Sequence, residues 1–256
     1  MAGLQVIYTL WLREMKWFVR AKSRLISSLI QPFLWLAIMG VGMSAAFNIP
    51  GFLQFMVPGV IGMTLIFSSM MSGVSVLWDK QFGFMKEILV APVSRTHVML
   101  GKALGGMTVS MLQGMLLLLA AGLLVGVWPP SIIAFIQVLA FMALISLGFV
   151  SAGLAFASKI EDPIAFPVVM NFIIMPLFFL SGAFFPIGTA PDWMRAIAHA
   201  NPLMYGVDGI RGAISGTSNL PIMTANFPIL IDFGILSVFC AAMILLGGYL
   251  FRKISA

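Results

Sequence analysis

Residues that could carry out chemistry are few and scattered in this chain. The two histidines, His97 and His199, belong to no H-E-x-x-H motif, and no G-x-S-x-G motif occurs. Gly101-Lys102 has part of the pattern of a phosphate-binding loop, but Thr96 stands where the first glycine belongs and Ala103 where Ser or Thr belongs. We therefore expect no catalytic site, no metal site and no cofactor bound by this chain itself.

The polar side chains deepest in the apolar runs are Ser110, Gln113, Ser151 and Asn171. Such groups commonly form hydrogen bonds between membrane helices. The alternative is that they line a substrate path, for which Gln113 and Asn171 are the candidates. An interior with 20 methionines and 22 phenylalanines suits a lipophilic substrate better than an ion.

Two ionisable residues, Lys102 and Asp232, lie close to the ends of apolar runs. At such positions a side chain can reach toward the membrane surface while its stem stays in the apolar region. We therefore expect this reach toward the surface to be sufficient for Asp232 at the outer end of the last span and for Lys102 near the inner end of the third.

Composition predicts an all-α integral membrane protein. Hydrophobic residues make up 61% of the chain and charged residues 9%, whereas soluble domains are roughly 45–50% apolar and about 25% charged. A membrane-spanning helix needs about 20 apolar residues. Six stretches meet this length, and we expect residues 1–256 to form one transmembrane domain with spans at about 25–47, 53–77, 104–127, 132–157, 164–185 and 229–251.

The distribution of basic residues predicts the orientation. If both termini are cytoplasmic, 12 of the 14 Lys and Arg residues lie on the inner side, and the other two are Arg195 and Arg211. Cytoplasmic loops of membrane proteins are enriched in Lys and Arg. We therefore expect an N-in/C-in, multi-pass protein of the plasma membrane.

The stretch at residues 3–22 has the pattern of an amphipathic helix. Its apolar side chains, which include Leu4, Ile7, Tyr8 and Met15, fall on one stripe. Such a helix lies in the inner interface, with its rings among the acyl chains and its basic face on anionic lipids. The alternative is a cytosolic helix packed on a partner protein. The residues expected to face the lipid surface or its headgroups are Trp11, Arg13, Lys16, Phe18 and Arg20.

The segment at residues 79–95 is unusually apolar for a loop outside the membrane. Asp79 can cap a short helix and Pro92 can end it. On that helix Phe82, Met85 and Leu89 would share one face. We expect this face to occupy a groove on a partner, or else to pack on the underside of the bundle itself.

The segment at residues 186–228 is rich in Pro and Gly and still fairly apolar. This composition suits short helices that dip back into the outer leaflet before the last span. Asp192/Arg195 and Asp208/Arg211 are i,i+3 pairs, worth about 0.2–0.5 kcal/mol each on a helix surface. A structural role for these pairs is favoured over substrate binding.

Two motifs make the chain resemble a known family. Residues 86–95, Lys-Glu-Ile-Leu-Val-Ala-Pro-Val-Ser-Arg, resemble the cytoplasmic signature of ABC transporter type-2 permeases, the exporter subunits of the daunorubicin-resistance and G-subfamily kind. Phe185-Pro186, Asn201-Pro202-Leu203 and Asp208-Gly209-Ile210-Arg211 are similar to the end of span five and the external segment of that family. We expect the protein to differ from the G-subfamily in having neither a fused nucleotide-binding domain nor an outer-loop disulfide.

The resemblance implies the partners and the sites. The permease half would pair with a second half, expected to be identical, and with two copies of a separate P-loop ATPase that brings ATP and Mg; nucleic acid is not among the expected partners. The segment after span two would be the coupling helix that docks on the ATPase, with contacts at Phe82, Met85, Lys86, Glu87, Ile88, Leu89 and Arg95. The external gate would include Pro186, Asn201, Pro202, Tyr205, Asp208 and Arg211.

The function expected from these features is export of a lipophilic drug-like or lipid-like substrate, driven by the separate ATPase. Export of a polysaccharide or glycolipid is the nearest alternative within the same family. A membrane enzyme that modifies lipids is disfavoured, because the metal and nucleophile motifs that it needs are missing. A channel is disfavoured by the scarcity of charged residues in the spans.

Overall fold

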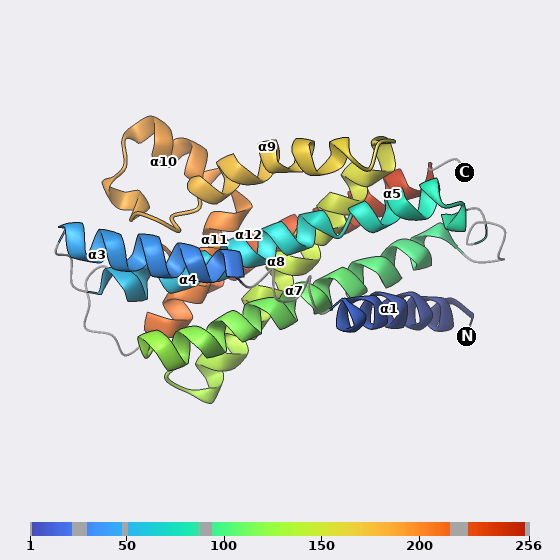
Figure 1. The fold of residues 1–256 in the computed structure, drawn as a ribbon. Helices are drawn as coiled ribbons and strands as arrows, with labels where there is room; N and C mark the ends of the chain where they lie inside the picture. Colours follow the sequence, from blue (N-terminus) through green and yellow to red (C-terminus); the bar gives the residue numbers. More distant parts are fainter. Residues whose placement is uncertain are drawn as a thin grey trace.

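The computed structural model describes residues 2–21, 30–47, 51–85, 87, 94–215 and 225–253 (Figure 1). Within these ranges every regular element is a helix, which confirms the all-α prediction. Figure 1 shows an elongated bundle in which both termini, the end of α5 and the start of α7 lie at one end. The short helix α10 and the connection between α7 and α8 lie at the other end.

Four stretches of helix are long and apolar enough to cross a membrane. They are α4 (Phe52–Met71) continued by α5 (Val74–Gln81), α7 (Arg95–Val125), α8 (Ile132–Lys159) and α12 (Ile229–Arg252). They correspond to the predicted second, third, fourth and sixth spans. α7 begins at Arg95, earlier than the predicted residue 104, because the Ser94 side chain accepts a hydrogen bond from the Thr96 amide and caps the helix there.

Two shorter apolar helices correspond to the predicted first and fifth spans. Ile30–Ala46 includes a π-helical turn, η1 (Trp35–Gly40), and leads into α3 (Val41–Phe47). α9 (Ala165–Phe179) ends well before residue 185, and Gly182 then turns the chain with a φ of 73°. Both helices are shorter than the ~20 residues of a full span. Four helices of the described residues thus have the length of a full span, and the count of six spans stays a prediction; the predicted start of the first span at residue 25 lies outside those residues.

α4 forms the centre of the bundle. It contacts α7, α8, α9 and α11, and most of its large side chains are completely enclosed, including Phe55, Met56, Ile61, Leu65, Ile66 and Met70. Gly59 lets the chain after α9 come close, because a Cβ at this position would lie 2.5 Å from Ala183 Cα. A helix buried on most sides in this way must be mainly apolar, as α4 is apart from Gln54, Thr64, Ser68 and Ser69.

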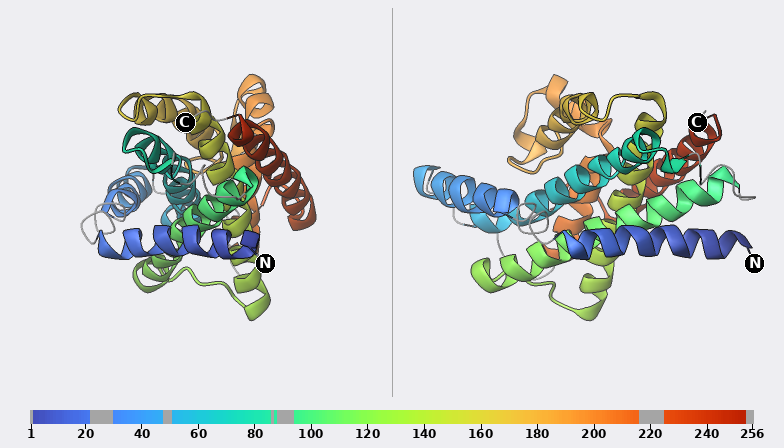
Figure 2. Two further views of the ribbon diagram at one scale, coloured as in Figure 1. Left: turned by 90° about the vertical axis from the view of Figure 1, so that its right-hand side faces the viewer. Right: turned by 45° about the vertical axis from the view of Figure 1, so that its right-hand side comes forward.

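Helix α1 (Ala2–Arg20) confirms the helix predicted at residues 3–22, and it lies along the outside of the bundle beside α7 (Figures 1 and 2). Two glycines of α7 allow this approach. A Cβ at Gly101 would lie 2.9 Å from Leu10 Cβ, and one at Gly105 would lie 2.7 Å from Glu14 Cβ. One side of α1 therefore packs against the helical bundle of the same chain.

The segment before the last helix contains η2 (Ile187–Thr189), α10 (Asp192–His199) and α11 (Pro202–Ser215). The predicted short helices are therefore present. α11 is not a surface helix, because it packs between α4, α8 and α12 and nearly all of its residues are buried.

Candidate coupling, gating and substrate-binding sites

A cluster of four charged side chains joins α1, α5 and α7. The Asp79 carboxylate lies 2.6 Å from Arg13 Nη2 and 2.5 Å from Lys102 Nζ. Lys102 Nζ also donates to Ser75 Oγ at 3.2 Å and lies 3.6 Å from Glu14 Oε1. Two cations thus face two carboxylates, and loss of one member would leave a charge that is largely removed from water without its partner.

This cluster corrects two predictions. Asp79 lies in the last turn of α5 and does not cap a following helix, because its carboxylate is occupied by Arg13 and Lys102. The Lys102 side chain is 1% exposed, so its ammonium group is enclosed and paired and does not reach water. The sequence could not indicate this, since the three helices are brought together only by the packing of α1 on α7.

The predicted coupling segment is not one helix from residue 79 to residue 95. α5 ends at Gln81, and Gly83 has a φ of 79°, a left-handed conformation that interrupts a helix. Met85 is 1% exposed and belongs to the bundle core, so it is not part of an exposed ridge. Phe82 is 66% exposed, and Phe84 and Glu87 are also exposed.

The remaining predicted coupling residues divide into two groups. Arg95 begins α7, and its Nη1 donates to the Arg252 carbonyl oxygen at 2.7 Å, which ties the start of α7 to the end of α12. Lys86, Ile88 and Leu89 lie outside the described residues, and their assignment to the coupling segment stays a prediction.

Most of the residues predicted for the interfacial helix take part in intramolecular contacts. Trp11 Nε1 donates to Thr108 Oγ1 at 3.0 Å, Phe18 is buried and Arg13 binds Asp79. Lys16 and Arg20 are exposed. The face with Trp11 and Phe18 is therefore directed at least partly toward the bundle, while Lys16 and Arg20 remain available to lipid headgroups.

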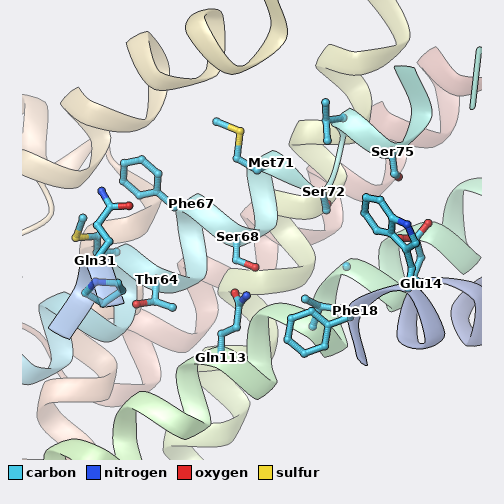
Figure 3. A pocket seen from close by; sticks show the side chains of 16 residues that line it. Glu14, Phe18, Gln31, Thr64, Phe67, Ser68, Met71, Ser72, Ser75 and Gln113 are labelled. Carbon is cyan, nitrogen blue, oxygen red and sulfur yellow. The ribbon is translucent and has the colours of Figure 1, made fainter. Parts of the chain in front are cut away.

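A cavity of about 250 Å³ lies between α1, the helix at Ile30–Ala46, α4 and α7 (Figure 3). Figure 3 shows Gln113 of α7 directed toward Ser68 of α4 across this space. Of the two predicted pathway residues, Gln113 lines the cavity, and Asn171 does not: it is exposed on α9. The structure therefore does not bring Gln113 and Asn171 together within one chain.

The two serines predicted to join helices behave differently. Ser110 Oγ donates to Ser68 Oγ at 3.0 Å and accepts from Ser69 Oγ at 3.1 Å, so it does connect α7 with α4. Ser151 Oγ donates to the Leu147 carbonyl oxygen of its own helix at 2.7 Å. The interhelical prediction is confirmed for Ser110 and is wrong for Ser151.

At the opposite end of the bundle, Asn201 and Pro202 start α11. Asn201 Oδ1 accepts from the Leu203 amide at 3.0 Å, and Asn201 Nδ2 donates to the Leu177 carbonyl oxygen of α9 at 2.6 Å. Proline is well suited to the first position of a helix. Tyr205 adds a second connection, because its hydroxyl donates to the His199 carbonyl oxygen at 2.7 Å. These residues fix α11 relative to α9 and α10.

Asp208 and Arg211 form a buried pair, not a surface pair. The Asp208 carboxylate accepts from the Asn226 amide at 2.7 Å, from Asn226 Nδ2 at 2.7 Å and from the Phe227 amide at 3.0 Å. Arg211 lies 3.7 Å from Asp208 and 4.1 Å from the centre of the Phe55 ring. The surface value expected from the i,i+3 spacing therefore does not apply, because both side chains are enclosed.

Arg211 also holds the chain after α9, since its Nη2 donates to the Gly182 carbonyl oxygen at 2.8 Å. Burial lowers the pKa of the Arg211 guanidinium to about 10, and the Asp208 carboxylate opposes this shift. The guanidinium is still charged at neutral pH. Pro186 directly precedes the short turn η2, and its carbonyl oxygen accepts from Thr189 Oγ1 at 2.9 Å.

Asp232 lies in the first turn of α12, at the predicted end of the last span, but its side chain does not reach water. Its exposed fraction is 0%, and neither carboxylate oxygen has a hydrogen-bond partner in the part of the chain that the structure describes. The signal for this buried group was present in the sequence, where Asp232 is a single acid within an apolar run.

These features define a class of protein: a membrane-embedded helical bundle with an amphipathic N-terminal helix, an internal cavity and tightly anchored short helices at one end. The family model of the ABC-2 type transporter matches residues 5–215. The chain therefore belongs to the ABC-2 type transporter family, and it is a transport permease of a membrane rather than an enzyme. Permeases of this family work with an ATPase partner.

Individual relatives agree with this assignment. The chain is 30% identical over 210 residues to a putative transport permease, ycf38, of Cyanophora paradoxa, covering 78% of this chain and 72% of that relative. It is 28% identical over 247 residues to the inner membrane transport permease YadH of Escherichia coli strain K12, covering 93% and 91%. It is 26% identical over 215 residues to the daunorubicin resistance ABC transporter permease protein DrrB1 of Streptomyces coeruleorubidus, covering 82% and 74%.

Proposed function

We propose that this chain is the transmembrane half of an ATP-driven exporter that moves a lipophilic drug-like or lipid-like substrate. In this proposal two identical halves form the permease, two copies of a separate ATPase supply ATP and Mg, and both termini are cytoplasmic. The observation that supports it best is the cavity beside α1, whose surface is mainly apolar and also carries hydroxyl groups, amide groups and the Glu14 carboxylate.

The position of the cavity suggests how ATP hydrolysis would act on it. α4 and α7 both line the cavity, and α5 continues α4 into the segment that we assign to ATPase docking. Asp79 of α5 is tied to Arg13 of α1 and Lys102 of α7. A push on the end of α5 would therefore move three walls of the cavity together, as in rigid-body switching between two packed arrangements.

Drug-like or lipid-like cargo is favoured over a polysaccharide for a chemical reason. A sugar chain needs many hydrogen-bond partners along its length, because each unpaired polar group removed from water costs free energy. The larger part of the cavity surface is apolar, beside the hydroxyl groups of Thr64, Ser68, Ser72 and Ser75; its apolar side chains include Phe18, Met63, Phe67, Met71 and Val109. The relative from Streptomyces coeruleorubidus is named as a daunorubicin resistance permease, which agrees with a drug-like substrate here.

The test uses two substitutions in the proposed coupling segment. Leu89→Asp should leave membrane insertion and folding intact, while co-purification of the ATPase and ATP-dependent uptake into inverted vesicles are lost, because buried apolar anchors often cost ~2 kcal/mol or more to remove from an interface. Met85→Asp is the matched comparison: Met85 is in the bundle core, so a charge there should destroy the fold. Normal uptake by Leu89→Asp would contradict the assignment of ATPase docking to this segment.

A further inference from the structure

The cavity beside α1 is one part of a longer groove. A second cavity of about 540 Å³ lies next to it, and the two share Glu14, Trp17 and Ser75 in their linings. Figure 3 shows Glu14 and Ser75 at one end of the first cavity and Gln31 near the other. Together the two spaces have the size of pockets that hold drug-sized ligands, which are roughly 300–1,000 Å³.

Aromatic rings dominate the second cavity. Its lining contains Trp17, Trp78, Phe82 and Phe84, whose exposed fractions lie between 38% and 66%. The rings of Trp78 and Phe82 are stacked with their centres 5.6 Å apart. The faces of aromatic rings attract organic cations, and tryptophan does so most strongly.

Glu14 is the carboxylate common to both cavities. Among the described residues, Glu14 contacts charged groups only through its Oε1 atom, and both contacts are long. Oε1 lies 3.6 Å from Lys102 Nζ and 3.7 Å from Arg13 Nη2. The short contacts of both cations go to Asp79 instead, at 2.5 Å and 2.6 Å. Glu14 therefore keeps an acceptor that a positively charged ligand can use.

Arg13 and Lys102, the described basic residues beside Glu14, are less suited to bind a ligand. Arg13 Nη2 is held by both oxygens of Asp79, at 2.9 Å and 2.6 Å. Lys102 is enclosed and paired with the same carboxylate. Among the described residues that line the first cavity, Glu14 is the charged one. The lining therefore favours a ligand whose positively charged group lies where the two cavities meet and whose apolar part lies in the first cavity.

We propose that this groove binds a lipophilic organic cation. The charged centre lies between Glu14 and the rings of Trp17 and Trp78, and the apolar body extends into the first cavity toward Ser68 and Gln113. This inference rests on the proposed export function, to which it adds the substrate class and an entry site beside α1.

The binding experiment compares two probes of equal size and opposite charge. The full chain is purified in detergent, and binding of radiolabelled tetraphenylphosphonium and tetraphenylborate is measured by equilibrium dialysis against protein-free micelles. Tetraphenylphosphonium should bind saturably and tetraphenylborate should not. Equal binding of the two ions would overturn the proposal, because the apolar effect alone would then account for it.

Substitutions locate the site. Glu14→Gln and Trp78→Leu should each weaken tetraphenylphosphonium binding about tenfold, as expected for loss of one ionic or one desolvated cation–π contact. The matched control is Asp192→Asn, which removes an exposed carboxylate on α10 at the other end of the bundle and should leave binding unchanged. Thermal unfolding of each variant shows whether it is folded. Binding at wild-type affinity by both folded Glu14→Gln and folded Trp78→Leu would overturn the assignment.

A zwitterionic lipid carries a similar ammonium group, so lysophosphatidylcholine is added as a competitor. It should displace the probe much more weakly than unlabelled tetraphenylphosphonium does, and equal displacement would assign the groove to lipid and overturn the proposal.

The proposed export function is tested separately, by capture of the ATPase and ATP-dependent uptake. If the ATPase complex forms but no cation binds, the proposed substrate class is wrong and the export function stands. If the cation binds but no ATPase complex forms, the export function is wrong and the cation site stands.

Discussion

At the scale of single residues, the same sequence spacing gives two different outcomes in this protein. Asp192 and Arg195 form an ion pair on α10 with the aspartate almost fully exposed. Asp208 and Arg211 have the same i,i+3 spacing on α11, but both are enclosed and are bonded to Asn226, Phe227 and the chain after α9. Exposed pairs of this kind contribute about 0–1 kcal/mol, whereas enclosed charges depend strongly on their partners.

We predict that Asp208→Ala lowers the free energy of unfolding by about 3–5 kcal/mol, because the Arg211 guanidinium would be left buried without its carboxylate. Three hydrogen bonds to the segment before α12 would be lost as well. Thermal or denaturant unfolding of the purified chain in detergent measures the change.

The matched control is Asp192→Ala, which should change stability by less than about 0.5 kcal/mol. The double variant Asp208→Ala/Arg211→Met should be more stable than Asp208→Ala alone, since it removes the uncompensated charge. Equal stability losses for Asp208→Ala and Asp192→Ala would show that the buried pair is not needed for the fold.

At the scale of helices, the contact of α1 with α7 depends on glycine. A Cβ at Gly101 would lie within 3.2 Å of the Ile7 backbone and 2.9 Å from Leu10 Cβ. The indole of Trp11 also reaches Thr108 of α7. α1 is therefore held by close packing and by the charge cluster around Asp79, not by lipid contact alone.

We predict that Gly101→Val separates α1 from α7 and destabilises the protein by about 1–3 kcal/mol, the usual range for overpacking. Gly234→Ala on α12 is the control, because a Cβ at that position would have no neighbour within 4 Å among the described residues, and alanine there should be neutral or slightly stabilising. Unfolding in detergent compares the two variants. Accessibility of a cysteine placed at Thr108, in a Cys240→Ser background, should rise with Gly101→Val, and unchanged accessibility would show that α1 stays in place.

The sequence predicted where most of the helices lie along the chain, but it predicted little about which helices pack against each other. Apolar length located α8 well, because that signal is local, whereas α7 begins earlier than predicted, where Ser94 caps it. The burial of Lys102, Met85 and α11 was missed, because each depends on helices that are distant in the chain. The break at Gly83 was missed for another reason: the run of apolar residues around it has helical spacing, and a single glycine does not by itself reveal a left-handed conformation.

For the candidate sites, motifs were more informative about position than about role. Asn201-Pro202 was singled out as part of an external gate, and the structure shows that it caps α11 and binds α9. Gln113 was chosen for its depth in an apolar run, and it does line a cavity. Glu14 was not singled out, since an acid within a basic amphipathic helix has no distinctive pattern in sequence.

At the scale of the whole molecule, the segments predicted to be cytoplasmic gather at one end of the bundle. Figure 1 shows both termini there together with the end of α5 and the start of α7. α10 lies at the other end. This arrangement supports our proposal that both termini face the cytoplasm.

We predict that Asp192→Cys reacts with a membrane-impermeant maleimide in intact cells and that Glu87→Cys does not, each in a Cys240→Ser background. Both positions are exposed, so the difference reports their side of the membrane. Permeabilised cells provide the control, because both cysteines should react there. Labelling of Glu87→Cys in intact cells would show that the orientation is opposite to the proposed one and that the coupling segment is not cytoplasmic.

The position of both termini at one end of the bundle also has a consequence for protein engineering. The C-terminus of one copy can be fused to the N-terminus of a second through a flexible linker without adding a membrane-crossing segment. A flexible linker of n residues spans on average about 5–6 Å × √n, so its length can be chosen to suit the distance between two neighbouring copies. Such a tandem fusion would allow a substitution to be placed in one half only, so that the two copies of a groove or of a docking segment could be disabled one at a time within a single polypeptide.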